Sequence, residues 1–235
     1  MNISVPKGYL RFSGWTLFIG GIMGVIGQVL HGKDVPDSVA QIPSFLNQAV
    51  NLHVLLAYAS TLILLGLPGL FIRQSAGLKK WGWIGLPVLF IGLMFEIFHG
   101  PVQILAYPIL FDAVKDDAAL KVISDQINNM SIDKFPLQLA VLIPIVPCIL
   151  IGLLLTGLSS IKARVLPKGP GILCFINIGI FVISQFVHLP IFDYSFSLIH
   201  LAITWFGAIL AFESYKAFSS TSSPSPSPSP LHQQI

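Results

Sequence analysis

The chain has 235 residues, of which 54% are apolar and only 10% are charged, and its mean hydropathy is +0.81. Soluble domains carry about 25% charged residues, so this composition excludes an ordinary soluble protein and predicts an integral membrane protein. The formal net charge of +3 is small, and no basic patch is interleaved with aromatic residues, so nucleic acid is not an expected partner.

Apolar runs of about 20 residues, the length needed to cross a bilayer, recur along residues 1–218. They predict an all-α bundle of six transmembrane helices, at residues 12–31, 52–72, 82–110, 136–160, 169–190 and 195–215. The first run is too long for the apolar region of a signal peptide, so we interpret it as a retained span. The third run must tilt, kink or protrude, and Gly100–Pro101 offers a kink or a stop. Residues 219–235 form a Ser/Pro-rich tail that we expect to be disordered.

The distribution of basic residues predicts the orientation of these spans. If the N-terminus is cytoplasmic, most Lys and Arg residues, including Lys7, Lys80 and Lys162, fall on the cytoplasmic side. This arrangement follows the positive-inside rule. We therefore expect a protein of the cytoplasmic (inner or plasma) membrane with both termini in the cytoplasm. The lipid bilayer is the expected partner, and another membrane subunit is a candidate partner.

Two of the outer loops have features of short helices. Residues 113–128 place Val114, Leu120 and Ile123 close to helical spacing, and residues 37–50 indicate a second short helix that Pro43 interrupts. Both segments are either interfacial helices that cover the bundle or ordinary loops.

Three of the apolar runs resemble one another. Residues 14–32, 82–101 and 169–190 each begin with Gly, continue through apolar residues and reach a histidine near their end. These histidines are His31, His99 and His188. The other three spans carry His53, Gln138 and His200 close to the end at which the chain enters them from the outer side. This self-similarity predicts three tandem helical hairpins of the same orientation.

The repeat also gathers polar residues at one level of the bundle. At 1.5 Å per residue, the five histidines of the spans (His31, His53, His99, His188 and His200) lie about 24–30 Å from the cytoplasmic ends of their helices. Gln28, Gln103, Gln138 and Gln185 add amides to this polar layer. The layer is a candidate binding site, although each histidine alone is also typical of an anchor at the membrane boundary.

Glu96 is an acidic residue that lies well inside a predicted span. It stands three residues before His99, which places both side chains on one face of a helix. Ionisable groups at such depth usually face the bundle interior and mark functional sites. The alternative is a neutral glutamic acid that only holds neighbouring helices together.

Three chemistries could use this layer. A divalent transition metal would take imidazole and carboxylate ligands from Glu96, His99, His188 and His200. A b-type haem would take two axial ligands from the five histidines. Glu96 and His99 could instead relay protons or bind a transported cation, because histidine titrates near neutral pH.

The hypotheses for function are therefore an electron-transfer protein with a metal or haem, a proton-coupled or small-solute transporter that uses Glu96, and a structural or assembly subunit of a membrane complex. The motifs of zinc proteases, serine hydrolases, P-loop NTPases and c-type haem proteins are missing from the sequence. Catalytic residues therefore stay unknown, and no enzyme class is predicted.

Residues 62–96, "LILLGLPGLFIRQSAGLKKWGWIGLPVLFIGLMFE", combine a Leu/Gly-rich span, a Gly-Leu-x-x-Arg-Gln turn and a second Gly-rich span. This pattern resembles small polytopic bacterial membrane proteins with no assigned function. The resemblance covers the second and third spans well and the rest loosely. It implies about six helices and transfers no activity.

Overall fold

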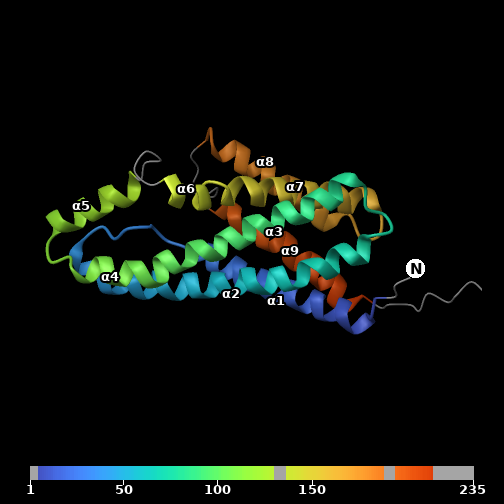
Figure 1. Ribbon diagram of the computed structural model, residues 1–235, viewed down its shortest axis with the longest axis horizontal. Coiled ribbons are helices and arrows are strands. Elements are labelled where there is room, and N and C mark those ends of the chain that lie inside the picture. Colours follow the sequence, from blue (N-terminus) through green and yellow to red (C-terminus); the bar gives the residue numbers. More distant parts are fainter. Residues whose placement is uncertain (1–4, 130–135, 188–193, 214–235) are drawn as a thin grey trace, which may run out of the picture.

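The computed structural model describes residues 5–129, 136–187 and 194–213, which fold into helices and contain no strand (Figure 1). In these ranges five helical segments are long and apolar enough to cross a membrane, and α8 is a shorter apolar helix. The protein is thus all-helical, as predicted, and its composition is that of an integral membrane protein. The predicted tail at 219–235 lies outside the described residues.

The elements follow one another in the order used throughout. They are α1 (Lys7–Val29), η1 (Val39–Gln41), α2 (Ile42–Gln74), α3 (Lys80–Pro101), η2 (Val102–Ala106), α4 (Tyr107–Asp112), α5 (Asp117–Asn128), α6 (Pro136–Leu142), α7 (Ile145–Ala163), α8 (Gly169–Ser184) and α9 (Ser195–Phe212). Several elements join into longer apolar segments: η1 with α2, α3 with η2 and α4, and α6 with α7.

Helix α1 packs between α2 and α9, because glycines on two of its faces let the backbones approach closely. A Cβ atom added at Gly20 would lie 2.8 Å from the Ala59 carbonyl oxygen of α2. One added at Gly21 would lie 2.7 Å from the Thr204 amide nitrogen of α9. Small residues are typical of such interfaces in lipid, where association depends on close packing. We call α1, α2 and α9 the first helix group.

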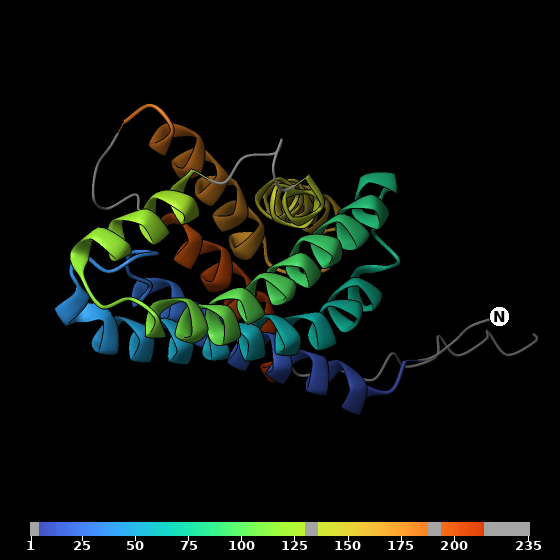
Figure 2. The same cartoon turned by 60° about the vertical axis from the view of Figure 1, so that its left-hand side comes forward.

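A second helix group consists of α3, α7 and α8 and uses the same device. Gly152 of α7 lies against Leu89 of α3, and Gly92 of α3 lies against Ile149 of α7. Contacts of α2 with α3 and of α8 with α9 join the two groups. In both views α1 and α2 run along one edge of the molecule, and α8 lies on the opposite edge (Figures 1 and 2).

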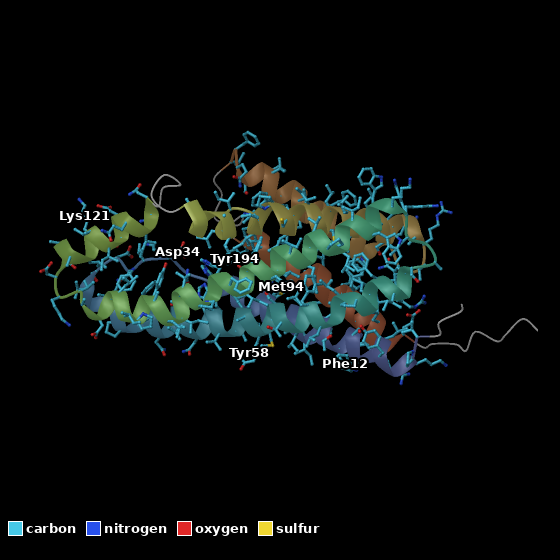
Figure 3. All side chains as sticks on the ribbon, viewed as in Figure 1. Phe12, Asp34, Tyr58, Met94, Lys121 and Tyr194 are labelled. Atoms are coloured by element: carbon cyan, nitrogen blue, oxygen red, sulfur yellow. The ribbon has the colours of Figure 1, made fainter. Side chains whose placement is uncertain are left out.

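One end of the bundle, which we call the cap end, carries the loop at residues 30–38, the start of α2, and the helices α4 and α5 (Figure 1). Figure 3 labels Asp34 and Lys121 at this end and Phe12 toward the opposite end, which we call the basic end because Lys7, Arg73 and Lys80 lie there. Helix α2 has 33 residues, and so has the segment from α3 to α4. Each is therefore about 50 Å long, roughly 20 Å more than the hydrocarbon core of a bilayer.

The cap end has an apolar cluster of its own, made of Ile42, Tyr107, Phe111, Val114 and Leu120. Further apolar residues of α2 and α5 pack against this cluster. The carboxylate of Asp117 also accepts a hydrogen bond of 3.0 Å from the Val39 amide, which ties α5 to the start of α2. These contacts hold α5 against α4 and against the first turns of α2.

Of the two short helices predicted in the outer loops, one is present and the other is not. The helix predicted within 113–128 is present as α5, and the Asp116 carboxylate caps it by accepting a hydrogen bond from the Ala119 amide. The separate short helix predicted over 37–50 is wrong, because α2 begins at Ile42 and continues without a break. Pro43 lies in the first turn of α2, where a missing N–H group costs nothing.

The third span does not end at Gly100–Pro101. The helix continues as the π-helical turn η2 and then as α4, which contains Pro108. A proline inside a helix cannot donate to the preceding turn and crowds its carbonyl groups. A π turn changes this local register, and it therefore accommodates the proline without ending the helix.

Candidate functional site

The candidate site lies where α2 and α3 meet near the cap end, at the interface between the two helix groups. Four polar side chains predicted for the polar layer line a common cavity there, together with Glu96. We call it the inner cavity, and its lining residues are Gln28, His31, His53, Leu56, Ala57, Glu96, His99 and Gly100. Its volume is about 90 Å³. A water molecule occupies about 30 Å³ in the liquid, so the inner cavity can hold a few water molecules or one small polar group.

Helical spacing explains why these side chains meet. His53 and Ser60 are seven residues apart on α2, which places them on the same face two turns apart. Glu96 and His99 share a face of α3 in the same way. Gly100 has no side chain, and a Cβ atom there would lie only 3.9 Å from the His53 carbonyl oxygen. The two helices are thus within ordinary van der Waals contact at the level of His99.

Glu96 has a specific partner on the neighbouring helix. The buried Ser60 hydroxyl donates a hydrogen bond of 2.9 Å to the Oε2 atom of Glu96, which is half-buried. This hydrogen bond crosses from the first helix group to the second. It fixes the carboxyl group at the inner cavity and leaves Oε1 as a further acceptor.

The His53 ring has a defined tautomer. Its Nδ1 atom lies 2.8 Å from the Ala49 carbonyl oxygen, and a carbonyl oxygen can only accept. Nδ1 must therefore carry the hydrogen, which makes Nε2 the acceptor atom of the neutral ring. Since the buried His53 side chain lines the inner cavity, it contributes a hydrogen-bond acceptor there.

Three imidazole rings follow one another across the site. The ring centroids of His31 and His53 are 5.2 Å apart, and those of His53 and His99 are 6.1 Å apart, both in edge-to-face arrangements. At such separations a single water molecule can bridge neighbouring rings. The exposed His31, the buried His53 and His99 thus form a row of three rings that ends beside Glu96.

A larger cavity of about 320 Å³, which we call the outer cavity, adjoins the inner one and shares His31 and His53 with it. The rest of its lining is Gly32, Lys33, Val35, Pro36, Asp37, Gln41, Ser44, Phe45, Gln48, Ala49, Leu52 and Gln103. Lys33 and Asp37 are exposed and form an ion pair of 2.8 Å. The outer cavity is therefore within reach of solvent at the cap end, and the inner cavity lies behind it.

A second carboxylate, that of Asp34, lies on the solvent side of the site. Asp34 is exposed and accepts a long hydrogen bond, 3.4 Å, from the buried Gln103 amide. Its charge interacts electrostatically with His53 and His99. Acidic groups thus stand on both sides of the imidazoles, with Asp34 toward solvent and Glu96 toward the bundle interior.

The remaining residues of the predicted layer are elsewhere or outside the described residues. His200 is buried in the interface between α9 and α1, where its ring lies against Gly24 and its Nδ1 atom is 3.2 Å from the Phe196 carbonyl oxygen. Gln185 is exposed and directly follows the last residue of α8. His188 lies outside the described residues, and so does the side chain of Gln138.

This arrangement gives no support to the metal hypothesis. Within the described ranges no group of three or more His, Cys, Asp and Glu residues is placed to hold a metal ion. The predicted ligand set is also divided, because His200 lines neither cavity, whereas Glu96 and His99 line the inner one.

A haem does not fit between His53 and His99. A porphyrin would have to stand between the two rings, where α2 and α3 are already in contact at Gly100. The inner cavity, at about 90 Å³, is also far smaller than the roughly 300–1,000 Å³ of pockets that hold drug-sized ligands.

Sequence reasoning did not include Ser60, Lys33 and Asp34 in the site. The position of Ser60, two helical turns after His53, was the available signal for its role. Lys33 and Asp34 follow His31 closely, but they lie in a loop whose path no periodic pattern predicts.

Comparison of this chain with known protein families, with characterised proteins and with solved structures gives no match. The resemblance to small bacterial membrane proteins therefore stays a prediction. The chemistry of the two cavities is therefore the basis for assigning a function.

Proposed function

We propose that this protein is a proton-coupled membrane transporter of a small solute, in which protonation of Glu96 is coupled to solute binding. The observation that carries this proposal is the inner cavity, where Glu96 and three histidines converge behind a solvent-accessible outer cavity. Water molecules hydrogen-bonded to the three rings would provide a route for protons between solvent and Glu96, with Nε2 of His53 as an acceptor along that route.

In the proposed orientation the cap end faces the outside and the basic end faces the cytoplasm, with both termini cytoplasmic. The lysines and arginines at the basic end support this orientation through the positive-inside rule. We further propose that α8 completes a set of six spans arranged as three tandem hairpins. The pairwise packing of α1 with α2, of α3 with α7 and of α8 with α9 supports this arrangement.

The position of the site also fits a transporter. Between Glu96 and the basic end the bundle contains a large apolar core that includes Leu67, Leu89 and Leu153. The polar cavities thus lie on the cap side of an apolar barrier. Transport requires a second conformation, and transporter sites are typically placed between two helix groups that move against each other. The interface between α2 and α3, where Ser60 meets Glu96, has this position.

Proton movement in vesicles tests the proposal. Purified protein is reconstituted into liposomes that contain a pH-sensitive dye and a mixture of small organic solutes (an amine, an alcohol and a carboxylate), and dilution into solute-free buffer drives the solutes outward in exchange for protons. We expect wild-type vesicles to acidify faster than protein-free vesicles. We expect Glu96→Gln to abolish the difference, because the amide has nearly the same shape but cannot bind a proton.

A control variant separates loss of the proton site from general damage. Gln185→Ala changes a polar residue of the predicted layer that lines neither cavity, and it should acidify like the wild type. Wild-type vesicles that acidify no faster than protein-free ones would overturn the transport proposal and leave a structural role for the polar site. Full activity of Glu96→Gln would show that Glu96 is not the coupling group.

A further inference from the structure

We propose that the two cavities together bind a small primary organic amine in its protonated form. This inference rests on the proposed function and adds the class of solute. The inner cavity would hold the ammonium group, and the outer cavity would hold the organic part of the molecule.

The inner cavity is lined by hydrogen-bond acceptors and one negative charge. Its one formally charged side chain is Glu96, which is an acceptor with Oε1 still available. His53 adds the lone pair of Nε2, because its Nδ1 hydrogen is committed to the Ala49 carbonyl. Gln28 also lines the inner cavity, and its amide can offer an oxygen as an acceptor. A primary ammonium group has three donors and no acceptor, so it matches a site that offers acceptors and a negative charge.

The outer cavity has a partly apolar wall that suits the organic part of the molecule. Its wall combines the apolar side chains of Val35, Pro36, Phe45 and Leu52 with polar groups nearer the surface. Its ion pair, Lys33 with Asp37, contributes no net charge. A volume of about 320 Å³ is at the lower end of the range for pockets that hold drug-sized ligands, so the outer cavity has room for a small organic group.

Binding of the amine would displace a proton. The protonated carboxyl group of Glu96 loses its hydrogen, the carboxylate pairs with the incoming ammonium ion, and the hydrogen leaves as a proton toward solvent past the histidines. The charge of the site is the same before and after, so an apolar environment can accommodate either occupant. This competition would couple outward movement of one cation to inward movement of the other.

Calorimetry with the detergent-solubilised full chain tests the proposal. The probes are butylammonium, its neutral counterpart butanol, the anion butyrate, and tetramethylammonium, a cation without N–H donors. We expect butylammonium to bind more tightly than each of the other three. Titrations in two buffers of different ionisation enthalpy should show the release of protons on binding, toward one proton per butylammonium. Preferred binding of butyrate or butanol would overturn the proposal.

Two variants locate the site. Glu96→Gln and His53→Phe should each weaken butylammonium binding by about tenfold or more, since each removes an acceptor for a charged donor. Gln185→Ala should bind like the wild type, and thermal unfolding shows whether each variant is folded. Unchanged affinity in both folded site variants would contradict the assignment. Vesicle acidification without butylammonium binding would refute the amine alone, whereas binding without acidification would refute proton-coupled transport.

Discussion

At the scale of single residues, the hydrogen bond between Ser60 and Glu96 is the contact on which the site depends. Ser60 is buried on α2, and its hydroxyl is directed to a carboxyl group on another helix. Its neighbour Thr61 is exposed, and its hydroxyl donates only to the Ala57 carbonyl of its own helix. The two hydroxyls are thus a matched pair, one in the site and one outside it.

We expect Ser60→Ala to lower the free energy of unfolding by about 1 kcal/mol, because one hydrogen bond to a half-buried acid is lost. Proton flux in vesicles should fall but not vanish, since Glu96 remains and loses only its orientation. Thr61→Val should leave both quantities unchanged. Equal effects of the two substitutions would mean that the contact of Ser60 with Glu96 has no special role.

At the scale of helices, glycine contacts decide which faces pack. Gly207 of α9 lies so close to α1 that an added Cβ atom would be 2.8 Å from the Leu17 carbonyl carbon and 2.8 Å from the Phe18 Cα atom. Gly179 of α8 has no atom within 4 Å of the same position. Backbone atoms cannot move aside as the end of a side chain can, so the first glycine is required and the second is not.

We therefore expect Gly207→Ala to destabilise the protein by roughly 1–3 kcal/mol through overpacking. Gly179→Ala should be neutral or stabilise by up to about 1 kcal/mol, because alanine favours the helix. Thermal unfolding of both variants in the same detergent measures the difference. A Gly207→Ala variant as stable as the wild type would show that α1 and α9 can separate at low cost.

The sequence predicted the helices better than their ends. Apolar periodicity and length were sufficient for the long spans, because both are local properties of the chain. The start of α2 was not predicted, because a proline is compatible either with a break between two helices or with the first turn of one, and only the tertiary contacts of Ile42 and its neighbours decide between them. The continuation past Pro101 was within the predicted third span, but the π turn that allows it was not predicted.

The sequence also predicted the site only in part. The depth of Glu96, His99, His53 and His31 follows from counting residues along each helix. Depth does not fix the rotation of a helix about its axis, and rotation separates the three clustered histidines from His200, which faces α1. Rotation depends on glycine contacts between helices that are distant in the sequence, and these contacts have no local signature.

At the scale of the whole molecule, labelling of single cysteines tests the proposed orientation and the number of spans. In a background of Cys148→Ser and Cys174→Ala, we expect Lys121→Cys on α5 to react with a membrane-impermeant maleimide added outside intact cells. Arg164→Cys, just after α7, should react only after the membrane is opened. The reverse pattern would invert the orientation.

Tyr194→Cys tests the sixth span in the same background. Tyr194 lies between α8 and α9 and is exposed. If α8 crosses the membrane, this cysteine should react from outside, like the one at position 121. Reaction only after the membrane is opened would show that α8 does not cross, and the three-hairpin arrangement would fail with it.

The π turn η2 has a consequence for how the cap is joined to the membrane-spanning part of the chain. A residue added within a helix rotates everything beyond it by about 100°, since there are 3.6 residues per turn. Tyr107 and Phe111 follow η2 directly and face the cap cluster. Deletion of a single residue from Val102–Ala106 would therefore preserve an apolar helix of nearly the same length but turn both aromatic rings away from α2 and α5. The phase of this one helix therefore determines whether Tyr107 and Phe111 can join the apolar cluster at the cap end.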